Sequence, residues 1–386
     1  MSGTGVTAAA GFRAAGVAAG LKSSGGADVA LVVNDGPGHA AAGVFTANRV
    51  KAAPVLWSEQ VLTSGALRAV VLNSGGANAC TGPAGFQDTH ATAEHVAAAL
   101  GCGAGEVAVC STGLIGERLP MPLLLDGVDK AVASLSELGG VDAAVAICTT
   151  DSHHKEAVAT ASGVTVGGMA KGAGMLAPAL ATMLCVITTD AVAEADALDR
   201  ALRAATRTTF DRLDTDGCMS TNDTVLLLAS GASGVAPDDD TLTRLVMEVC
   251  DDLARQLMDD AEGADKRIVI HVTGAASEDD AVAVGRAIAR SSLLKCAVHG
   301  ADPNWGRVLA AVGTTSAVFE PDALDVSFNG VQVCRAGAIG DDRSLVDLTG
   351  SEVLIAVDLH AGTATATVRT TDLTAAYVHE NSAYST

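Results

Sequence analysis

A single threonine stands where a glycine- and proline-containing loop meets an apolar run. The loop, which extends from Lys171 to Ala181, reads KGAGMLAPALA, and Thr182 opens the β-branched run that follows. The start of a strand is held by the sheet, while the peptide bond before it stays accessible. If the bond between Ala181 and Thr182 were cut, the new α-amine, with a reference pKa near ~8, would act as general base for the threonine hydroxyl. For a lone threonine, one more β-branched strand residue is the more common interpretation.

Two further stretches could stabilise a reacting oxygen or bind an anion. Ser111-Thr112-Gly113 follows the apolar run Val107–Cys110, and such a strand end can present a hydroxyl and backbone N–H groups to an oxyanion. A Ser/Thr turn is the alternative interpretation. The glycine-rich stretch from Asn73 to Asn78 lacks the lysine and helix of a phosphate-binding loop, so we expect a tight turn there.

Charged residues near element ends give weaker signals. Glu262 lies where a helix is expected to end and a strand to begin, so its carboxylate either takes a substrate ammonium or is only a helix-end charge. In the stretch from His299 to Arg307, Asp302 is predicted to cap a helix whose first residue is Pro303.

The elements that must position these residues alternate between short β-branched runs and alanine-rich amphipathic stretches. Hydrophobic residues make up 49% of the 386 residues but aromatics only 3%, so the core must be built from small aliphatic side chains. The pattern predicts mixed α and β layers. Expected strands are 29–33, 43–46, 69–72, 107–110, 144–148, 157–161, 183–189, 224–228, 268–273, 324–328, 353–358 and 363–369. Expected helices are 88–100, 121–138, 194–208, 239–258, 278–291 and 304–312.

The charge balance excludes several classes of partner. With 24 lysines and arginines against 45 aspartates and glutamates, the net charge is −21. Such a chain repels nucleic acid and anionic lipid, so we expect small molecules or further copies of the chain as partners. The absence of a continuous apolar 20-residue segment and of a signal-like N-terminus indicates a cytoplasmic protein without a membrane span. The scattered cysteines predict neither disulfides nor a metal site.

The ordered motifs also resemble a known family. They are Lys171-Gly-Ala-Gly-Met-Leu-Ala-Pro with Ala181-Thr-Met-Leu, Asn73-Ser-Gly-Gly-Ala-Asn, Ser111-Thr-Gly, Thr149-Thr-Asp, Ser220-Thr-Asn-Asp-Thr, His299-Gly-Ala-Asp-Pro-Asn-Trp-Gly-Arg and Glu380-Asn-Ser-Ala-Tyr. This set closely resembles the ornithine acetyltransferase family, also called the glutamate N-acetyltransferases of arginine biosynthesis. The resemblance runs from Gly11 to Thr386, which is essentially the whole chain.

The resemblance implies a fold and a processing event. The implied fold is an αββα sandwich of two packed sheets with outer helices, of the N-terminal-nucleophile-like (DOM-type) class, plus a smaller C-terminal α/β part. Autocatalytic cleavage between Ala181 and Thr182 is implied, giving an alpha fragment of residues 1–181 and a beta fragment of residues 182–386. The fragments are expected to stay folded together and to assemble as a heterotetramer of two of each.

The implied activity is acetyl transfer in the cyclic arginine pathway. Thr182 takes the acetyl group of N2-acetyl-L-ornithine, releases ornithine and holds the acetyl group as an ester. L-Glutamate then takes it in a ping-pong cycle, giving N-acetylglutamate. No cofactor is expected. Some members also accept acetyl-CoA as donor, and the sequence leaves open whether this chain does.

Site residues are carried over by motif. Thr182 matches the nucleophile, and Thr112 and Gly113 match the oxyanion hole, one through its hydroxyl and the other through its backbone N–H. A carboxylate suits the ornithine ammonium and Lys171 suits an α-carboxylate. The positions matched to substrate contacts are Lys171, Thr182, Glu262, Asn381, Thr386 and one of Thr149 and Thr150.

Some residues depart from the usual pattern, and two other functions stay open. Gly76, Ala179-Leu180 and Cys218 are the departures, which concern donor and acceptor preference. One alternative is an N-terminal-nucleophile amidohydrolase or aminopeptidase of similar fold, in which water replaces glutamate. The other is a non-catalytic amino-acid-binding relative, against which the joint presence of nucleophile, oxyanion pair and lysine argues.

Overall fold

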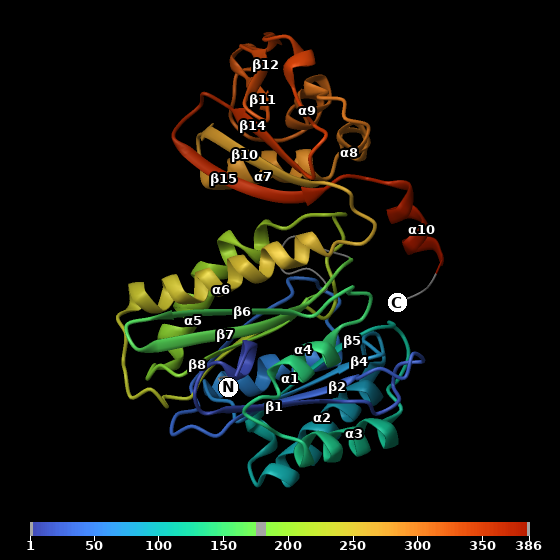
Figure 1. Cartoon of the computed structure of the whole chain (residues 1–386), viewed down its shortest axis with the longest axis vertical. Coiled ribbons are helices and arrows are strands. Elements are labelled where there is room, and N and C mark those ends of the chain that lie inside the picture. The colour runs from blue at the N-terminus through green and yellow to red at the C-terminus, as the bar shows by residue number, and fades with distance from the viewer. Residues whose placement is uncertain (1–2, 175–182, 384–386) are drawn as a thin grey trace.

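The computed structural model describes residues 3–174 and 183–383, whose elements form a larger sandwich and a smaller C-terminal part (Figure 1). The strands of the sandwich are β1 (Phe12–Val17), β2 (Val29–Asn34), β3 (Ala41–Phe45), β4 (Ala69–Ser74), β5 (Val107–Thr112), β6 (Lys155–Ala161), β7 (Val164–Lys171), β8 (Leu184–Thr189) and β9 (Thr224–Ala229). Its helices are α1 (Ala53–Val61), α2 (Gly82–Leu100), α3 (Met121–Ala133), α4 (Gly140–Ile147), α5 (Ala195–Thr208) and α6 (Asp239–Asp259).

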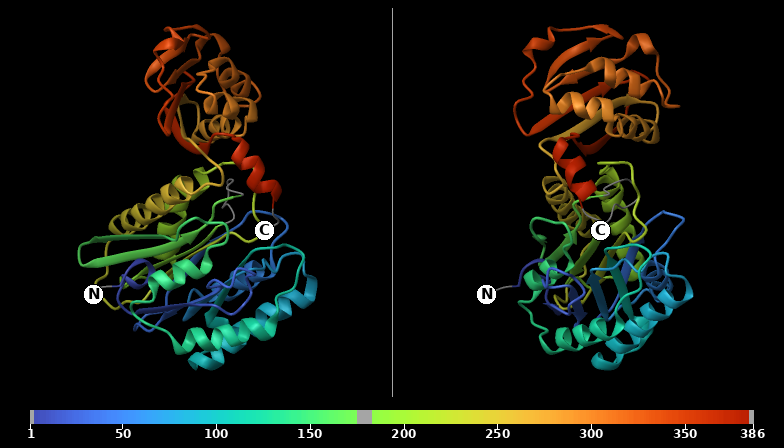
Figure 2. Two further views of the ribbon diagram at one scale, coloured as in Figure 1. Left: turned by 45° about the vertical axis from the view of Figure 1, so that its right-hand side comes forward. Right: turned by 90° about the vertical axis from the view of Figure 1, so that its right-hand side faces the viewer.

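The sandwich has four layers. One sheet has the strand order β1-β2-β4-β5 and the other has the order β3-β9-β8-β7-β6. The two sheets face each other, α2 and α3 cover the outer face of the first, and α5 and α6 cover the outer face of the second (Figures 1 and 2). This arrangement confirms the predicted αββα sandwich.

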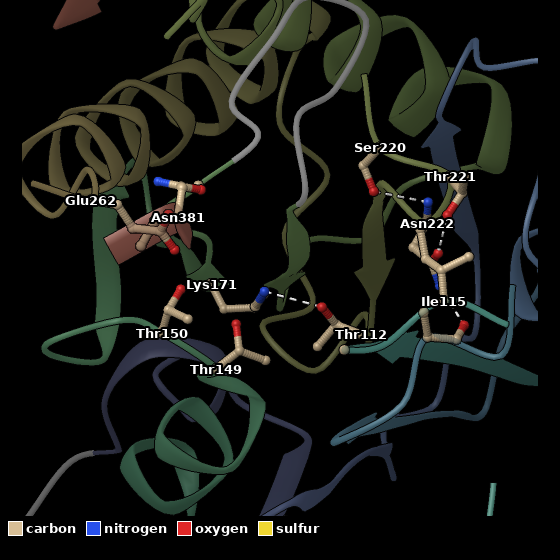
Figure 3. Close-up of a pocket in the computed structure, with 14 residues that line it drawn as sticks. Thr112, Ile115, Thr149, Thr150, Lys171, Ser220, Thr221, Asn222, Glu262 and Asn381 are labelled. Carbon is tan, nitrogen blue, oxygen red and sulfur yellow. Dashed lines mark hydrogen bonds between the residues drawn. The ribbon is translucent and has the colours of Figure 1, made fainter. Parts of the chain in front are cut away.

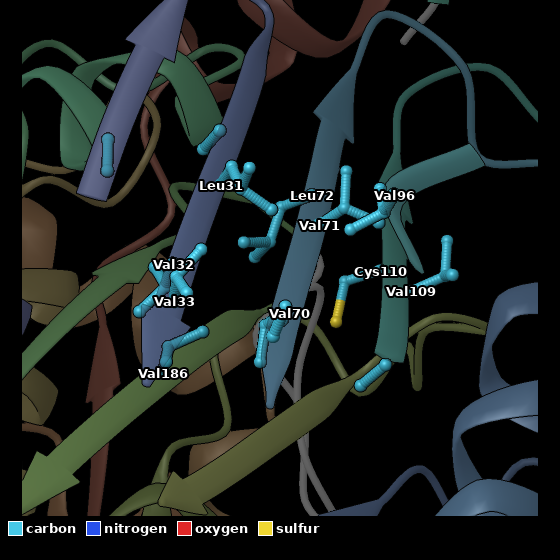
Figure 4. Close-up of a cluster of buried hydrophobic side chains, with 14 of the residues drawn as sticks. Leu31, Val32, Val33, Val70, Val71, Leu72, Val96, Val109, Cys110 and Val186 are labelled. Atoms are coloured by element: carbon cyan, nitrogen blue, oxygen red, sulfur yellow. The ribbon is translucent and has the colours of Figure 1, made fainter. Parts of the chain in front are cut away.

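The main hydrophobic core fills the space between the two sheets. Val32 and Val70 of the first sheet and Val186 of β8 belong to one buried cluster, in which none of the three side chains is exposed (Figure 4). A second cluster packs α5 and α6 against the other face of the five-stranded sheet. Strands such as β2 and β4 are therefore covered on both faces, which explains why their sequences are continuous apolar runs instead of alternating ones.

The C-terminal part is a second α/β unit, as predicted. Its six-stranded sheet has the order β13-β12-β11-β14-β10-β15 and is packed with helices around its own core. Its strands are β10 (Arg267–Ala275), β11 (Asp325–Phe328), β12 (Val331–Arg335), β13 (Ala338–Ile339), β14 (Glu352–Asp358) and β15 (Ala364–Thr371), and its helices are α7 (Glu278–Ala289), α8 (Ser292–His299) and α9 (Trp305–Val312). From this unit the last helix, α10 (Ala375–Ala383), returns toward the sandwich (Figure 2).

The predicted strand 144–148 is wrong. These residues lie in and directly after helix α4, which packs on β1 and β2. The buried residues Ala143, Ala146 and Ile147 follow helical spacing, but a run of five apolar residues is too short to show that period. The predicted helix 121–138 also ends earlier, at Ala133, where α3 stops.

The predicted helix cap at Asp302 is wrong as well. Asn304 caps α9, because its Oδ1 accepts the N–H of Arg307 at 3.2 Å, and Pro303 lies before the helix. Asp302 instead accepts a 2.8 Å hydrogen bond from Asn304 Nδ2 and so orients the capping amide. Both residue types are good caps, and local sequence does not distinguish between them.

Within residues 3–174 and 183–383, no helix combines the length and the apolar character that crossing a bilayer requires.

Candidate active site

One pocket gathers every predicted site residue that the structure describes. Its lining consists of Ala77, Thr112, Gly113, Ile115, Thr149, Thr150, Lys171, Ala173, Gly174, Ser220, Thr221, Asn222, Glu262 and Asn381. The predicted nucleophile Thr182, its neighbour Ala181 and the predicted contact Thr386 lie outside the described residues.

Five separate segments supply the predicted residues of the pocket (Figure 3). Thr112 ends β5 and is followed by Gly113, while Lys171 ends β7 of the opposite sheet. Thr149 and Thr150 come from the loop after α4, Glu262 from the loop after α6, and Asn381 from α10. The pocket therefore lies where the two sheets end and where the C-terminal helix meets the sandwich.

The Gly113 backbone N–H is aimed by a clamp on the preceding carbonyl. The backbone N–H groups of Gly75 and Gly76 both donate to the Thr112 carbonyl oxygen, each at 3.0 Å. In a planar trans peptide the C=O and N–H bonds point in opposite directions, so the Gly113 N–H points away from that turn. No group in the described part of the chain accepts from the Gly113 N–H. This leaves it available for a ligand oxygen, as an oxyanion hole requires.

Only glycine fits at position 113. Its φ is +130°, and an added Cβ would lie 2.5 Å from the backbone nitrogen of Gly76. The glycine-rich stretch from Asn73 to Asn78 forms the turn that the sequence predicts, and its backbone holds the strand end of β5 in place.

The Thr112 hydroxyl is oriented by a buried lysine. Lys171 Nζ donates to Thr112 Oγ1 at 3.1 Å, and Lys171 is only 2% exposed. An ammonium has donors but no acceptor, so the Thr112 oxygen accepts and its own proton is free to donate elsewhere. Burial lowers the pKa of the Lys171 ammonium, while the carboxylate of Asp151 acts in the opposite direction.

The other side of the pocket carries hydroxyl, amide and carboxylate groups. Figure 3 shows Thr150 facing Glu262 and Asn381, and Thr149 beneath Lys171, so both threonines line the pocket. Glu262 approaches Gly174 so closely that a Cβ there would lie 2.5 Å from its Oε2. A carboxylate next to an amide and two hydroxyls can bind an ammonium group.

Asn222 is a supporting residue to which the sequence gives no role. Its Nδ2 donates to the carbonyl oxygens of Ala77 at 2.7 Å and Ser111 at 2.8 Å, and the residue is 4% exposed. It thereby ties the start of β9 to the end of β5. The motif Ser220-Thr-Asn-Asp-Thr marks the position, but only the fold shows what its amide holds.

Asp223 is a second residue that sequence reasoning missed. Its Oδ1 accepts the backbone N–H of Met183, the residue that follows Thr182, at 2.9 Å. Its Oδ2 is buried, and burial raises the pKa of this carboxyl well above its ordinary range, although hydrogen bonds from Met183 and Ser220 act in the opposite direction. A long-range contact of this kind leaves no local signal in the sequence.

One set of side chains in the described part of the chain has the mutual distances of metal ligands. It consists of Asp265, His299 and Asp372, which three separate segments supply. Asp372 already accepts the N–H groups of Asp265 and Lys266 through Oδ1, and its Oδ2 lies 3.0 Å from His299 Nδ1. These contacts give the buried carboxylate its partners without an ion.

Comparison with known proteins decides the family. A family model described as the ArgJ family matches residues 13–386. The chain belongs to the ArgJ family. The Arginine biosynthesis bifunctional protein ArgJ of Streptomyces avermitilis is 70% identical over 380 residues, covering 98% of this chain and 99% of that protein. The protein of the same name from Thermobifida fusca is 68% identical over 381 residues, covering 99% of this chain and 100% of that protein.

A solved structure gives a further likeness. Ornithine acetyltransferase from Mycobacterium tuberculosis, complexed with ornithine, is 63% identical, and the match covers 45% of this chain and 95% of that chain with a TM-score of 0.43. The family match over residues 13–386 confirms, at the level of the ArgJ family, the resemblance inferred from the motifs. The roles of single residues in the pocket stay predictions.

Proposed function

We propose that the chain is a self-cleaving acetyltransferase that moves acetyl from N2-acetyl-L-ornithine to L-glutamate through an acetyl ester of Thr182. The observation that supports the proposal most strongly is the composition of the pocket. Five segments bring a hydroxyl, an unpartnered backbone N–H, an ammonium and a carboxylate to it. The names of the relatives, which include an ornithine acetyltransferase and bifunctional proteins of arginine biosynthesis, support the substrate class.

Chain scission is the first step of the proposal. The Thr182 hydroxyl oxygen attacks the Ala181 carbonyl carbon, the C–N bond breaks, and the nitrogen takes the hydroxyl proton. Water then hydrolyses the resulting ester, which restores the hydroxyl and leaves a carboxylate on Ala181. The free α-amine of Thr182 can then accept the proton of its own hydroxyl.

The transfer uses the same oxyanion donors twice. Thr182 Oγ attacks the acetyl carbonyl, and the oxyanion that develops accepts hydrogen bonds from the Thr112 hydroxyl and the Gly113 N–H. The C–N bond then breaks, and the ornithine nitrogen leaves with the proton held by the α-amine. In the second half-reaction the glutamate amine attacks the ester, and N-acetylglutamate leaves as Thr182 regains its proton.

The pocket supplies recognition for both substrates. Lys171 has donors left for an α-carboxylate after its bond to Thr112, and Glu262 with Asn381 suits the side-chain ammonium of ornithine. Because ornithine and glutamate share the amino-acid frame, one pocket can hold both in the orientation that transfer needs.

The proposal also covers the location, the assembly and the cofactor requirement of the enzyme. We expect a cytoplasmic heterotetramer of two alpha and two beta fragments that requires no cofactor, because the amine of the nucleophile serves as its own base. Acetyl-CoA is a candidate second donor. Formation of free CoA and N-acetylglutamate from acetyl-CoA and glutamate tests that part separately.

The test of the function uses Thr182 variants. Thr182→Ala should remain one full-length chain without activity, whereas Thr182→Ser retains a hydroxyl and should still cleave. Purified wild type is incubated with N2-acetylornithine, with and without glutamate. Formation of N-acetylglutamate supports the transferase. Acetate release at the full rate without glutamate would instead identify the hydrolase, and cleavage of Thr182→Ala would refute self-processing by this residue.

A further inference from the structure

Beneath the pocket lies a buried ionic cluster outside the matched site residues. Lys155, the first residue of β6, donates to Asp151 Oδ1 at 2.7 Å and to Asp260 Oδ2 at 2.5 Å. The side chains of Lys155 and Asp151 are fully buried, and that of Asp260 is 4% exposed. Buried ions are costly unless they are paired and hydrogen-bonded. A network as complete as this one therefore needs an explanation.

Asp151 does more than pair with Lys155. Its Oδ1 also accepts the N–H of Gly172 at 2.7 Å, and its Oδ2 accepts the N–H of Thr149 at 2.9 Å. Gly172 directly follows Lys171. One carboxylate therefore fixes the backbone on both sides of the amino-acid end of the pocket, at the end of β7 and in the loop after α4.

Lys171 needs a negative charge nearby. It is buried, its side chain donates to the neutral hydroxyl of Thr112, and no carboxylate in the described part of the chain forms an ion pair with it. Burial lowers the pKa of Lys171. Lys155 lowers it further, whereas Asp151, Cys148 and Asp223 raise it. The titratable groups that face it come from the loops, from β6 and from the start of β9: Asp151, Cys148, Lys155, Asp223 and Lys22.

Among these groups, Asp151 is the effective counter-charge. Burial raises the pKa of Asp223 well above its ordinary range, and it raises the pKa of the Cys148 thiol to about 11, so neither is readily ionised. Burial alone would also raise the pKa of Asp151, but Lys171 and Lys155 lower it to about 2. Asp151 is therefore negatively charged at any pH at which the enzyme would work.

We propose that Asp151 is a positioning residue of this active site: its buried carboxylate holds the backbone of Thr149 and Gly172, and with it the neighbouring Lys171 ammonium, at the pocket. The inference rests on the proposed function, because the ammonium is needed to bind the α-carboxylate and to orient Thr112. Asp151 does not itself reach substrate, since both of its oxygens are taken by Lys155 and by backbone N–H groups.

The direction of the expected effect follows from the charges. Removal of the Asp151 charge lets Lys171 lose its proton at lower pH, and transfer that needs the ammonium then fails at lower pH. A nearby opposite charge typically moves a pKa by about 1 to 3 units. The alkaline limb of the pH profile of kcat/KM should move down by about 1 to 3 pH units in Asp151→Asn, with a larger KM for N2-acetylornithine.

Asp260→Asn is the matched control. It removes the other carboxylate that pairs with Lys155, but Asp260 has a smaller effect on the charge of Lys171 than Asp151 has. Both variants weaken the buried cluster, so a purely structural role predicts the same change in both. The proposal predicts an alkaline limb that moves in Asp151→Asn and stays in place in Asp260→Asn.

The experiment measures pH profiles of acetyl transfer from N2-acetylornithine to glutamate for the wild type and both variants, after intact mass has shown cleavage. A limb unchanged in Asp151→Asn, or moved equally in Asp260→Asn, overturns the inference while the proposed function stands. A wild type without transfer overturns the proposed function itself. If Asp151→Asn does not fold, Lys171→Arg gives the answer: a guanidinium stays charged, so the limb must disappear, and its persistence overturns the inference.

Discussion

The Thr112 hydroxyl accepts from Lys171 and keeps its own proton for a reacting oxygen. We expect Thr112→Ala to lower both the rate of chain scission and kcat of acetyl transfer by about 10²- to 10³-fold, because both reactions pass through a tetrahedral oxyanion. Scission is followed on denaturing gels over time, and transfer by the formation of N-acetylglutamate.

Thr112→Ser is the control, since it keeps a hydroxyl at the same position, and it should lose far less of either rate. A rise in KM with kcat unchanged in Thr112→Ala would contradict the oxyanion role, because it would mean that Thr112 binds substrate and transition state equally.

The lowered pKa of Asp151 also leads to a prediction for stability in acid. Its pKa is lowered from 3.8 to about 2 in the folded protein, so its stabilising contribution is complete above pH 3.8 and is lost as the pH falls to about 2. This contribution is about 2 kcal/mol. Urea unfolding of uncleaved Thr182→Ala should therefore lose a pH dependence of that size when Asp151→Asn is added. A stability difference that stays constant from pH 5 to 2 would contradict this.

At the scale of residues, the sequence predicts what is local or carried by a motif. Thr112, Lys171 and Glu262 were predicted and lie in one pocket, but their directions depend on backbone contacts that no motif states. The pairing of Lys155 with Asp260 could not be predicted, because the two residues are more than a hundred positions apart in the chain. Only the fold brings such charges together.

Helix α10 depends on one glycine for its position beside the pocket. Gly263 has a φ of +60°, and a Cβ there would lie 2.3 Å from the backbone nitrogen of Tyr377. Thr374 Oγ1 donates to the Gly263 carbonyl oxygen at 2.5 Å. We expect Gly263→Ala to push α10 and its Asn381 away, which should raise KM for N2-acetylornithine about tenfold, the effect of one lost hydrogen bond, without slowing scission. Steady-state kinetics measure the first effect and denaturing gels the second.

Gly234→Ala is the control for that experiment. Gly234 has a similar φ of +69° but nothing within 4 Å of an added Cβ, so it carries the backbone strain without the clash. Equal KM values in the two variants would show that the clash with α10 has no effect on substrate binding.

At the scale of elements, the long amphipathic helices and the fully buried strands were predicted, and the one element of the wrong type is the expected strand 144–148. Buried runs such as those of β2 and β9 are apolar throughout and bounded by polar turns, which is enough to place them. Strand β7 was missed because its centre, Gly167-Gly168, has low strand propensity; the glycines are there because a Cβ at Gly167 would lie 2.0 Å from the Gly5 carbonyl oxygen. The close packing of Gly167 against Gly5 therefore requires a glycine at this position.

The whole molecule explains how two fragments could stay together after scission. In the five-stranded sheet, β3, β6 and β7 precede position 182, whereas β8 and β9 follow it. Strand β8 pairs with β7 along its length, and β9 pairs with β3. Each fragment therefore contributes strands to one sheet and residues to one pocket.

We accordingly expect the cleaved fragments to elute together from a size-exclusion column under native conditions and to separate only in denaturant. A heterotetramer predicts an elution mass of two alpha and two beta fragments, to be measured by light scattering. Separate elution of the fragments at neutral pH would contradict the shared sheet as the source of their association.

The most direct test of the central claim is intact mass spectrometry of the purified protein mixed with N2-acetylornithine in the absence of glutamate. We predict two fragments, of which the one starting at Thr182 is heavier by one acetyl group and returns to its original mass when glutamate is added. A full-length chain that nonetheless transfers acetyl, or a 182–386 fragment that never gains an acetyl group during turnover, would contradict the account.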